Sequence, residues 1–255
     1  MSRRKTTSKP SWQPHPKMGL MLLAAALAVW LVCRLTPAWG PVYPADGQTH
    51  LLGYDSYYHA RHGLAVAQNF PHVARWDLGT HYAAGDMGVN AGGHDLYLAM
   101  LSLPLGGDRE AVMNTAAWSA TISGIVCLLA LFAVCRRLGA APWAGGVAAW
   151  LVVMYPAHAR SYFILGNADH HATEVLLTML PLLGLTFLFK EEQSFKDRLL
   201  VSLGTALPLA LFTITWFGAP LHLALIGLAF GFATLLFSIQ GKGDLVVLPA
   251  RALSI

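Results

Sequence analysis

The sequence has little charge, and this excludes most soluble folds. Charged residues make up only 12% of the 255 residues, about half of their share in a typical soluble domain. Hydrophobic residues make up 55%, and the mean hydropathy is +0.50. A soluble chain of this length cannot bury so much apolar surface in one core, so we expect the chain to lie in a lipid bilayer.

Cysteine patterns and the common catalytic motifs are also missing. The three cysteines lie in or beside apolar runs without metal-ligand spacing or a pairing pattern, which excludes a disulfide-stapled protein. The sequence has no glycine-rich nucleotide loop, no serine nucleophile elbow and no HExxH motif. Its net charge of +4 does not indicate nucleic acid, because the basic residues follow a membrane topology.

Charge-poor runs predict about six membrane-spanning helices. These runs are Met18–Cys33, Ala111–Cys135, Leu138–Ala159, Val175–Phe189 and Leu199–Ile239. The last run has 41 residues, about twice the length that crosses a bilayer, so we expect two helices joined by a turn at Trp216–Pro220. Because a helix satisfies its own backbone hydrogen bonds in lipid, the expected fold class is an all-α, polytopic membrane protein.

Lysine and arginine predict a cytoplasmic N-terminus. With that orientation 12 of the 17 basic residues face the cytoplasm, as the positive-inside rule requires. The first span resembles a signal peptide, but Arg34 and its bulky neighbours make a poor cleavage site, which favours an uncleaved anchor. We therefore expect a multi-pass protein of the cell (inner) membrane. Its parts would be a basic cytoplasmic tail (1–17), a membrane domain (18–240) with a long extracytoplasmic loop (34–110), and a short C-terminal tail (241–255).

The long loop contains a polar cluster near its start. Residues 55–69 suit a helix on which Asp55, His59 and His62 share one face at positions i, i+4 and i+7. Carboxylate and imidazole groups on one face can bind a metal. The alternative is that Asp55 caps an interfacial helix.

A second cluster, Gly166–Glu174, lies between the third and fourth predicted spans. Ionisable side chains at a membrane boundary are costly unless they are paired or metal-bound, so this cluster indicates function. Asp169 and His171 can reach one cation, and a carboxylate with an imidazole suits Mg²⁺ or Mn²⁺ better than a closed zinc site. A helix cap at Asp169 is the alternative, but it does not explain two adjacent histidines.

Both clusters lie on the same predicted face of the membrane, with the active face extracytoplasmic. Carboxylates from the two clusters can converge on one divalent ion, which can bind a diphosphate. Arg61 and Arg160 are candidates for holding phosphate oxygens, although arginines that reach the lipid headgroups explain them equally well. His94 and Asp95, in the glycine-rich part of the loop, are either further ligands or solvated loop residues.

These motifs resemble the catalytic subunit of oligosaccharyltransferase in its prokaryotic form, a C-type, polyprenyl-dependent membrane glycosyltransferase. The resemblance covers about residues 18–240. It rests on Asp55-x-x-x-His59, Gly166-x-x-Asp169-His170-His171-x-x-Glu174 and Thr215-Trp216-Phe217-Gly218-Ala219-Pro220. The family continues through further helices and a soluble domain, so we expect this chain to be the N-terminal portion, with 241–255 as a truncated end.

The resemblance implies transfer of an oligosaccharide from a polyprenyl diphosphate carrier to an asparagine of an acceptor polypeptide. A divalent cation, Mg²⁺ or Mn²⁺, would stabilise the leaving diphosphate. Asp55 and Asp169 would be catalytic, and the metal ligands would be Asp55, Asp169 and His171. We add His59, Arg61, His170 and Glu174 as the expected substrate- or diphosphate-binding residues. Two alternatives stay open, namely a related transferase that acts on lipid or wall glycans and a non-catalytic membrane subunit or fragment.

Overall fold

The chain is mostly helical over the residues that the computed structural model describes, which are 17–73, 76–77, 86–87, 92–155, 161–187 and 194–241. The helices are α1 (Met18–Leu35), α2 (Trp39–Val42), α3 (Tyr54–Gln68), α4 (Gly93–Ser102), the 3₁₀ helix η1 (Leu103–Leu105), α5 (Arg109–Arg137), α6 (Pro142–Met154), α8 (His170–Thr186), α9 (Phe195–Thr215) and α10 (Ala219–Ile239). Two short strands, β1 (Trp76–Asp77) and β2 (Asp86–Met87), pair antiparallel. Apart from Lys17 and Gly241, the two predicted tails lie outside the described residues, as does Arg160.

Four helices among the described residues are long and apolar enough to cross a membrane. They are α1, α5, α9 and residues 219–236 of α10. The helices α6 and α8 are shorter, with 13 and 17 residues, and the segments that follow them lie outside the described residues. The mostly helical, multi-span architecture is therefore confirmed, whereas the number of six spans stays a prediction.

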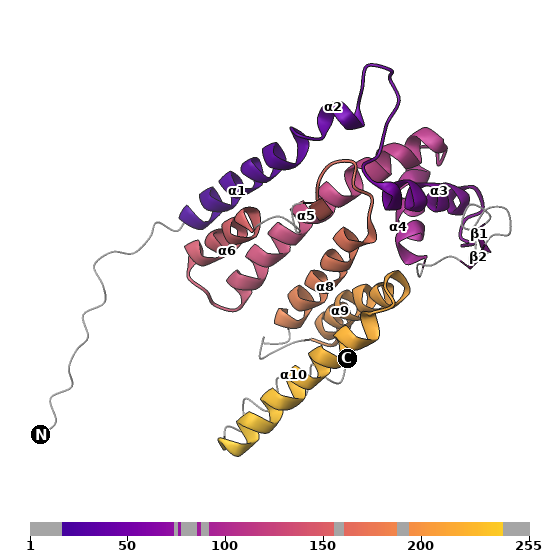
Figure 1. Cartoon of the computed structure of the whole chain (residues 1–255). Coiled ribbons are helices and arrows are strands. Elements are labelled where there is room, and N and C mark those ends of the chain that lie inside the picture. Colours follow the sequence, from indigo (N-terminus) through magenta and orange to yellow (C-terminus); the bar gives the residue numbers. More distant parts are fainter. Residues whose placement is uncertain are drawn as a thin grey trace, which may run out of the picture.

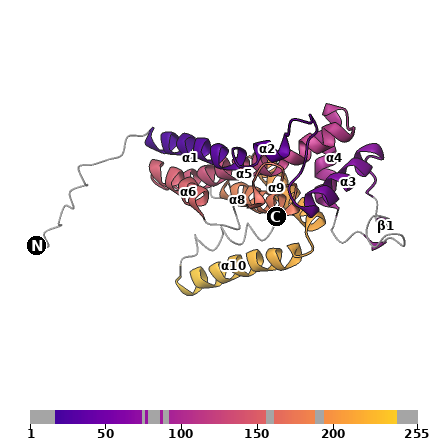
Figure 2. The ribbon, with the colours of Figure 1, turned by 45° about the horizontal axis from the view of Figure 1, so that its top comes forward.

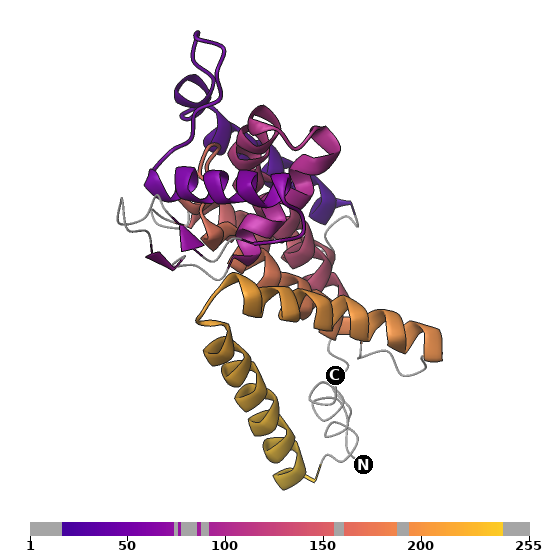
Figure 3. The ribbon, with the colours of Figure 1, turned by 90° about the vertical axis from the view of Figure 1, so that its right-hand side faces the viewer.

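The long charge-free run divides where the sequence predicts. The helix α9 ends at Thr215 and α10 begins at Ala219, with Pro220 in its first turn. Proline is tolerated at that position because the backbone N–H it lacks would have no partner within the helix. Figure 3 shows α10 leaving α9 at an angle and standing away from the other helices.

The helices α1, α5, α6 and α8 form a bundle whose long axes run in similar directions (Figures 1 and 2). Glycines let α1 and α6 touch, since a Cβ atom on Gly19 would lie 1.8 Å from the carbonyl oxygen of Pro142. In the centre the buried Trp30 of α1 packs against Gly124 of α5, where a Cβ atom would lie 2.2 Å from the indole ring. Close backbone approach at small residues is the usual way in which helices associate in lipid.

The helices α3 and α4 cover one end of this bundle (Figure 1). The helix α3 confirms the predicted helical segment that begins near Asp55. A buried apolar cluster joins α3 and α4 to α5 and to the loop before α8; its members are Ala38, Val42, Leu51, Ala60, Leu98, Val112, Ala116, Ala117, Leu165 and Ala168. This packing places the polar face of α3 beside the N-terminus of α8.

Candidate functional site

The N-terminus of α8 gathers two carboxylates and two imidazoles. Asp169 occupies the N-cap position, yet its side chain makes no capping hydrogen bond. Its Oδ1 lies 2.8 Å from Nδ1 of His170, and its Oδ2 lies 3.8 Å from Nε2 of His171. Glu174 closes the cluster from the next turn, with its carboxylate oxygens 3.2 Å from His170 and 3.1 Å from His171. The carboxylate of Asp169 therefore contacts the two histidines and does not cap the helix.

Two oxygens of this cluster lack a hydrogen bond. Among the described residues, Oδ1 of Asp169 and Oε1 of Glu174 are buried without a hydrogen-bond partner, although each lies in ion-pair contact with a nitrogen of His170. Buried polar atoms are nearly always paired, and an exception often marks the place of an ion. Carboxylate oxygens beside imidazole nitrogens are the donors that Mn²⁺ and related divalent cations accept. The donor set therefore fits a divalent cation.

The loop before α8 is fixed by backbone contacts on both sides. The N–H of Gly166 donates to the carbonyl of Ala117 in α5 at 2.8 Å, and the carbonyl of Gly166 accepts from the N–H of Leu52 at 2.8 Å. Gly166 has a positive φ of 84°, and a Cβ atom there would lie 2.4 Å from Val42. Only glycine meets both conditions without strain, which explains the first residue of the motif.

A serine on α3 holds the same loop. The hydroxyl of Ser56 is fully buried, donates to the carbonyl of Leu52 at 2.6 Å and accepts from the N–H of Ala168 at 2.9 Å. It therefore places Asp169 at a set distance from α3. Sequence reasoning missed this residue, since the hydroxyl and its partner are 112 positions apart.

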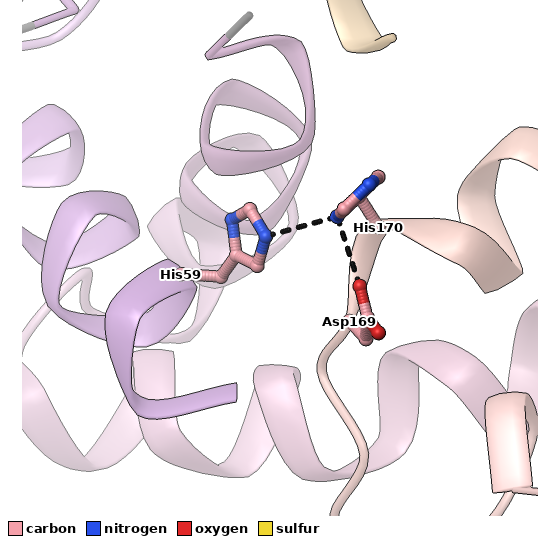
Figure 4. Close-up of side chains that lie close together, drawn as sticks. All are labelled: His59, Asp169 and His170. Carbon is pink, nitrogen blue, oxygen red and sulfur yellow. Dashed lines mark hydrogen bonds and ion pairs between the residues drawn. The ribbon is translucent and has the colours of Figure 1, made fainter. Parts of the chain in front are cut away.

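The α3 helix brings His59 to the cluster. The ring of His59 is 1% exposed, and its Nε2 lies 3.3 Å from Nδ1 of His170 (Figure 4). Asp55 lies one turn earlier in α3 and is exposed. Gly53, not Asp55, occupies the N-cap position of α3, so the capping role considered for Asp55 is not seen. The charge of Asp55 nevertheless contributes to raising the pKa of His170.

The charges of the cluster stabilise one another. Burial on its own would raise the pKa of Asp169, but the close approach of His170 and the charges of the neighbouring histidines lower it to about 2. Burial would lower the pKa of His170, but contact with Asp169 and the charges of the nearby carboxylates raise it. The two shifts have the signs expected of an ion pair between a carboxylate and an imidazolium.

Arg61 does not contact this cluster and pairs with a carboxylate of β1. Its guanidinium pairs with the carboxylate of Asp77 in β1, to which Nε2 of His62 also lies close, at 3.1 Å. The side chain of Arg61 stays about half exposed. The predicted role of Arg61 at a diphosphate stays a prediction, with Asp77 as its present partner.

His94 and Asp95 are not solvated loop residues, because both lie on α4 and are only 2% exposed. The sequence did not predict this burial, because the glycines around these two residues are typical of an exposed loop. His94 bonds to the hydroxyl of Thr173 and to the carbonyl of Ala168, each at 2.9 Å. Asp95 contacts His59, with 2.6 Å between Oδ1 and Nδ1.

Two groups of side chains among the described residues offer three ligand atoms that lie within 4.8 Å of one another. One consists of His59, Asp169 and His170, and the other of His170, His171 and Glu174. The predicted ligands Asp169 and His171 belong to these groups, whereas Asp55 belongs to neither. His59, His170 and Glu174, predicted to bind the diphosphate, lie in the same cluster.

Several solved structures share this fold, although a comparison with curated protein sequences gave no match. The oligosaccharyltransferase of Archaeoglobus fulgidus in the apo form superposes with a TM-score of 0.78 at 20% sequence identity, over 93% of this chain and 28% of that one. Its complex with Zn and sulfate gives 0.76 at 20% identity, over 91% and 30%. The archaeal oligosaccharyltransferase AglB from Archaeoglobus fulgidus, in complex with an inhibitory peptide and a dolichol-phosphate, gives 0.76 at 20% identity, over 92% of the present chain and 28% of that one. The present chain thus spans less than a third of the length of these relatives.

A family model also matches the sequence over nearly its whole length. The model describes the N-terminal part of the oligosaccharyl transferase STT3, and it matches residues 27–253. The matched region includes α3, the Gly166–Glu174 cluster and the turn between α9 and α10. The chain therefore belongs to the STT3 family of oligosaccharyl transferases, as a multi-span membrane protein that matches the N-terminal region of the family.

Proposed function

We propose that this protein transfers an oligosaccharide from a polyprenyl diphosphate carrier to an asparagine of an acceptor polypeptide. The observation that carries the proposal is the meeting of the α3 motif with the N-terminus of α8, where His59 contacts His170 beside Asp169. A membrane protein has little reason to gather two carboxylates and three imidazoles at a helix mouth unless they bind something. A relative with the same fold was solved in complex with an inhibitory peptide and a dolichol-phosphate, which supports the proposed classes of partner.

We assign a divalent cation, Mg²⁺ or Mn²⁺, to this site, with Asp55, Asp169 and His171 as ligands. The buried oxygen of Asp169 that lacks a hydrogen bond supports the assignment, and a relative was solved with Zn and sulfate. When bound, such a cation neutralises charge that develops on the leaving diphosphate. Asp55 is the exposed member of the set, so it is also the carboxylate best placed to meet an acceptor amide from solvent.

The remaining side chains would bind the diphosphate itself. A protonated His170 is favoured by its carboxylate neighbours, and an imidazolium donates hydrogen bonds to phosphate oxygens. Glu174 keeps His170 and His171 in place through its two oxygens. Arg61 would add a guanidinium from the exposed side of α3 after leaving Asp77.

We propose an orientation with the N-terminus in the cytoplasm and the site on the extracytoplasmic face of the cell membrane. The distribution of lysine and arginine supports it. The helices α3 and α4 lie together at one end of the bundle, which is consistent with a single aqueous face that holds the chemistry.

Glycan transfer by the membrane-embedded chain tests the function. Membranes that contain the chain would be supplied with lipid-linked glycan and an Asn-x-Thr peptide, and glycopeptide would be measured by mass spectrometry. Asp169→Asn should lower the transfer rate by more than about 100-fold, since a bound metal supplies several kcal/mol of transition-state stabilisation. EDTA should have the same effect, and excess Mn²⁺ should reverse it.

Asp46→Asn is the matched control, because Asp46 is an exposed carboxylate that bonds only to nearby residues of the same loop. It should transfer glycan at the wild-type rate. Equal rates for Asp169→Asn and the wild type would favour the non-catalytic alternative. Transfer to a hydroxyl acceptor instead of the peptide would favour the lipid or wall glycan alternative.

A further inference from the structure

Asp95 is a buried carboxylate without a role in the proposed function, and it contacts His59 of the site. Oδ1 of Asp95 lies 2.6 Å from Nδ1 of His59, and the two side chains are 2% and 1% exposed. An ionised carboxylate only accepts hydrogen bonds, so His59 must donate from Nδ1. In the neutral ring Nε2 then carries the lone pair.

That lone pair is directed at the cluster on α8. Nε2 of His59 lies 3.3 Å from Nδ1 of His170, and one ring nitrogen of each histidine lies within 4.8 Å of a carboxylate oxygen of Asp169. Figure 4 shows the three side chains converging from α3 and from the start of α8. The ring of His94 packs edge-on against His59, with 4.7 Å between the ring centres, and so restricts its rotation.

This arrangement is the one that proteins use to hold a metal-binding histidine. A carboxylate that accepts from one ring nitrogen fixes the tautomer and the ring orientation, and it makes the other nitrogen a stronger donor. A side chain that is 1% exposed and held on two sides is poorly suited to follow a mobile substrate. It is well suited to hold an ion in a fixed position.

We propose that His59 is a nitrogen ligand of the divalent cation at Asp169 and that Asp95 is its positioning residue. The proposal rests on the cation of the proposed function, and it moves His59 from the diphosphate to the metal. An added imidazole shifts the preference of the site from Mg²⁺, which takes oxygen ligands, towards Mn²⁺ or a later transition metal. Asp95 then acts on the reaction without contacting substrate.

A pair of buried carboxylates provides the test. Asp95→Asn removes the charge that holds His59, and Asp77→Asn removes a buried carboxylate that contacts Arg61 and His62 on the same helix. Mn²⁺ binding would be measured on the purified full chain in detergent. Asp95→Asn should weaken Mn²⁺ binding 10- to 100-fold, the usual effect of losing such a partner. Asp77→Asn should bind Mn²⁺ as the wild type does.

A spectroscopic readout separates positioning from general stability. Electron spin-echo modulation from ¹⁴N reports the imidazoles bound to Mn²⁺, and Asp95→Asn should lose one of them, as should His59→Gln. A wild-type ¹⁴N signal and a wild-type affinity in Asp95→Asn would overturn the proposal. So would an equal loss of Mn²⁺ affinity in Asp77→Asn, because Asp95 would then act only through packing.

The tautomer of His59 can be measured on the wild-type protein without metal, so this test does not depend on any variant folding. In the metal-free wild type, ¹⁵N NMR of labelled histidine should find His59 protonated at Nδ1, and protonation at Nε2 alone would overturn the role of Asp95. If the wild type binds no Mn²⁺, the proposed cation and the ligand role of His59 both fail. If Mn²⁺ binds and Asp95→Asn loses one ¹⁴N signal but no glycan is transferred, the present proposal holds and the proposed function fails.

Discussion

His94 and His170 both contact the ring of His59, and their environments are opposite. Each nitrogen of His94 has a partner, because Nε2–H donates to the carbonyl of Ala168 and Nδ1 accepts from the hydroxyl of Thr173. Burial, followed by the charge of His59, lowers the pKa of His94 to about 3. His94 is therefore a neutral ring that joins α4 to the start of α8.

The carboxylates around His170 raise its pKa even though burial opposes the change. Those same carboxylates keep buried oxygens without hydrogen bonds. A histidine with every polar atom paired stabilises the fold, whereas unsatisfied oxygens around a histidine favour a role in binding. Residue type alone does not separate the two roles in this chain; the partners do.

The largest expected effect is the loss of stability on replacing His94, the histidine that stabilises the fold. His94→Ala should lower the free energy of unfolding by about 3 kcal/mol, since it leaves a buried carbonyl and hydroxyl unpaired and opens a cavity. Thermal denaturation in detergent, followed by tryptophan fluorescence, would measure the loss. The exposed His72, whose Nδ1 contacts only the nearby carbonyl of Asn69, is the control, and His72→Ala should melt with the wild type.

On the functional side, His170→Asn should lower the rate of glycan transfer by about 10- to 100-fold, as the loss of one charge-assisted contact to phosphate would. Its melting temperature should fall less than that of His94→Ala, because both carboxylates that contact His170 also contact His171. Peptide glycosylation and thermal denaturation of the same preparation would measure both quantities. A large loss of stability with unchanged transfer would place His170 in the class of His94.

The loop before α8 contacts His94 through Ala168 and leads into His170. A single added methyl group in this loop should lower the stability of the protein. Gly166→Ala should cost about 2 kcal/mol of stability, since an alanine at positive φ is strained and its Cβ would meet Val42. Gly40→Ala is the control, because a Cβ atom there meets nothing within 4 Å. Chemical denaturation of both variants would show whether the motif glycine is required by the backbone.

The pH dependence of stability should carry opposite signs for the two rings. His94 has a lowered pKa, so its contribution is complete above about pH 6.5 and falls by about 1.4 kcal/mol per pH unit as the pH drops towards 3. His170 has a raised pKa, so its contribution is complete below about pH 6.5 and is lost as the pH rises through its folded pKa. Denaturation of His94→Gln between pH 5 and 7 should lack the acid-side slope. An unchanged slope would contradict the assignment of a neutral His94.

Local patterns in the sequence were enough to predict part of this molecule. The helix that starts near Asp55 and the turn at Trp216–Pro220 depend on neighbours in the chain, and both are confirmed. Asp169 and His171 are two residues apart, so their proximity could also be read from the sequence. Their role as ligands remains a prediction.

Contacts between distant segments could not be predicted in this way. Asp95 meets His59 across 36 positions, and the hydroxyl of Ser56 meets the backbone of Ala168 across 112. Both pairs depend on how α3, α4 and the loop before α8 pack, which no periodicity encodes. The glycines before α4 also suggested solvent exposure where the chain is buried. The polar partners that distinguish one histidine from another were therefore visible only in the folded chain.

The tether between Ser56 and Ala168 has a mechanical consequence. Together with the backbone bonds of Gly166 to Ala117 and Leu52, it ties α3 and α5 to the loop that leads into α8. When the bilayer thins or thickens, a transmembrane helix responds by tilting. The helix α8 belongs to one of the predicted spans. If it tilts in this way, the tether would move Asp169 and His59 together, and the distance between these two donors would change little.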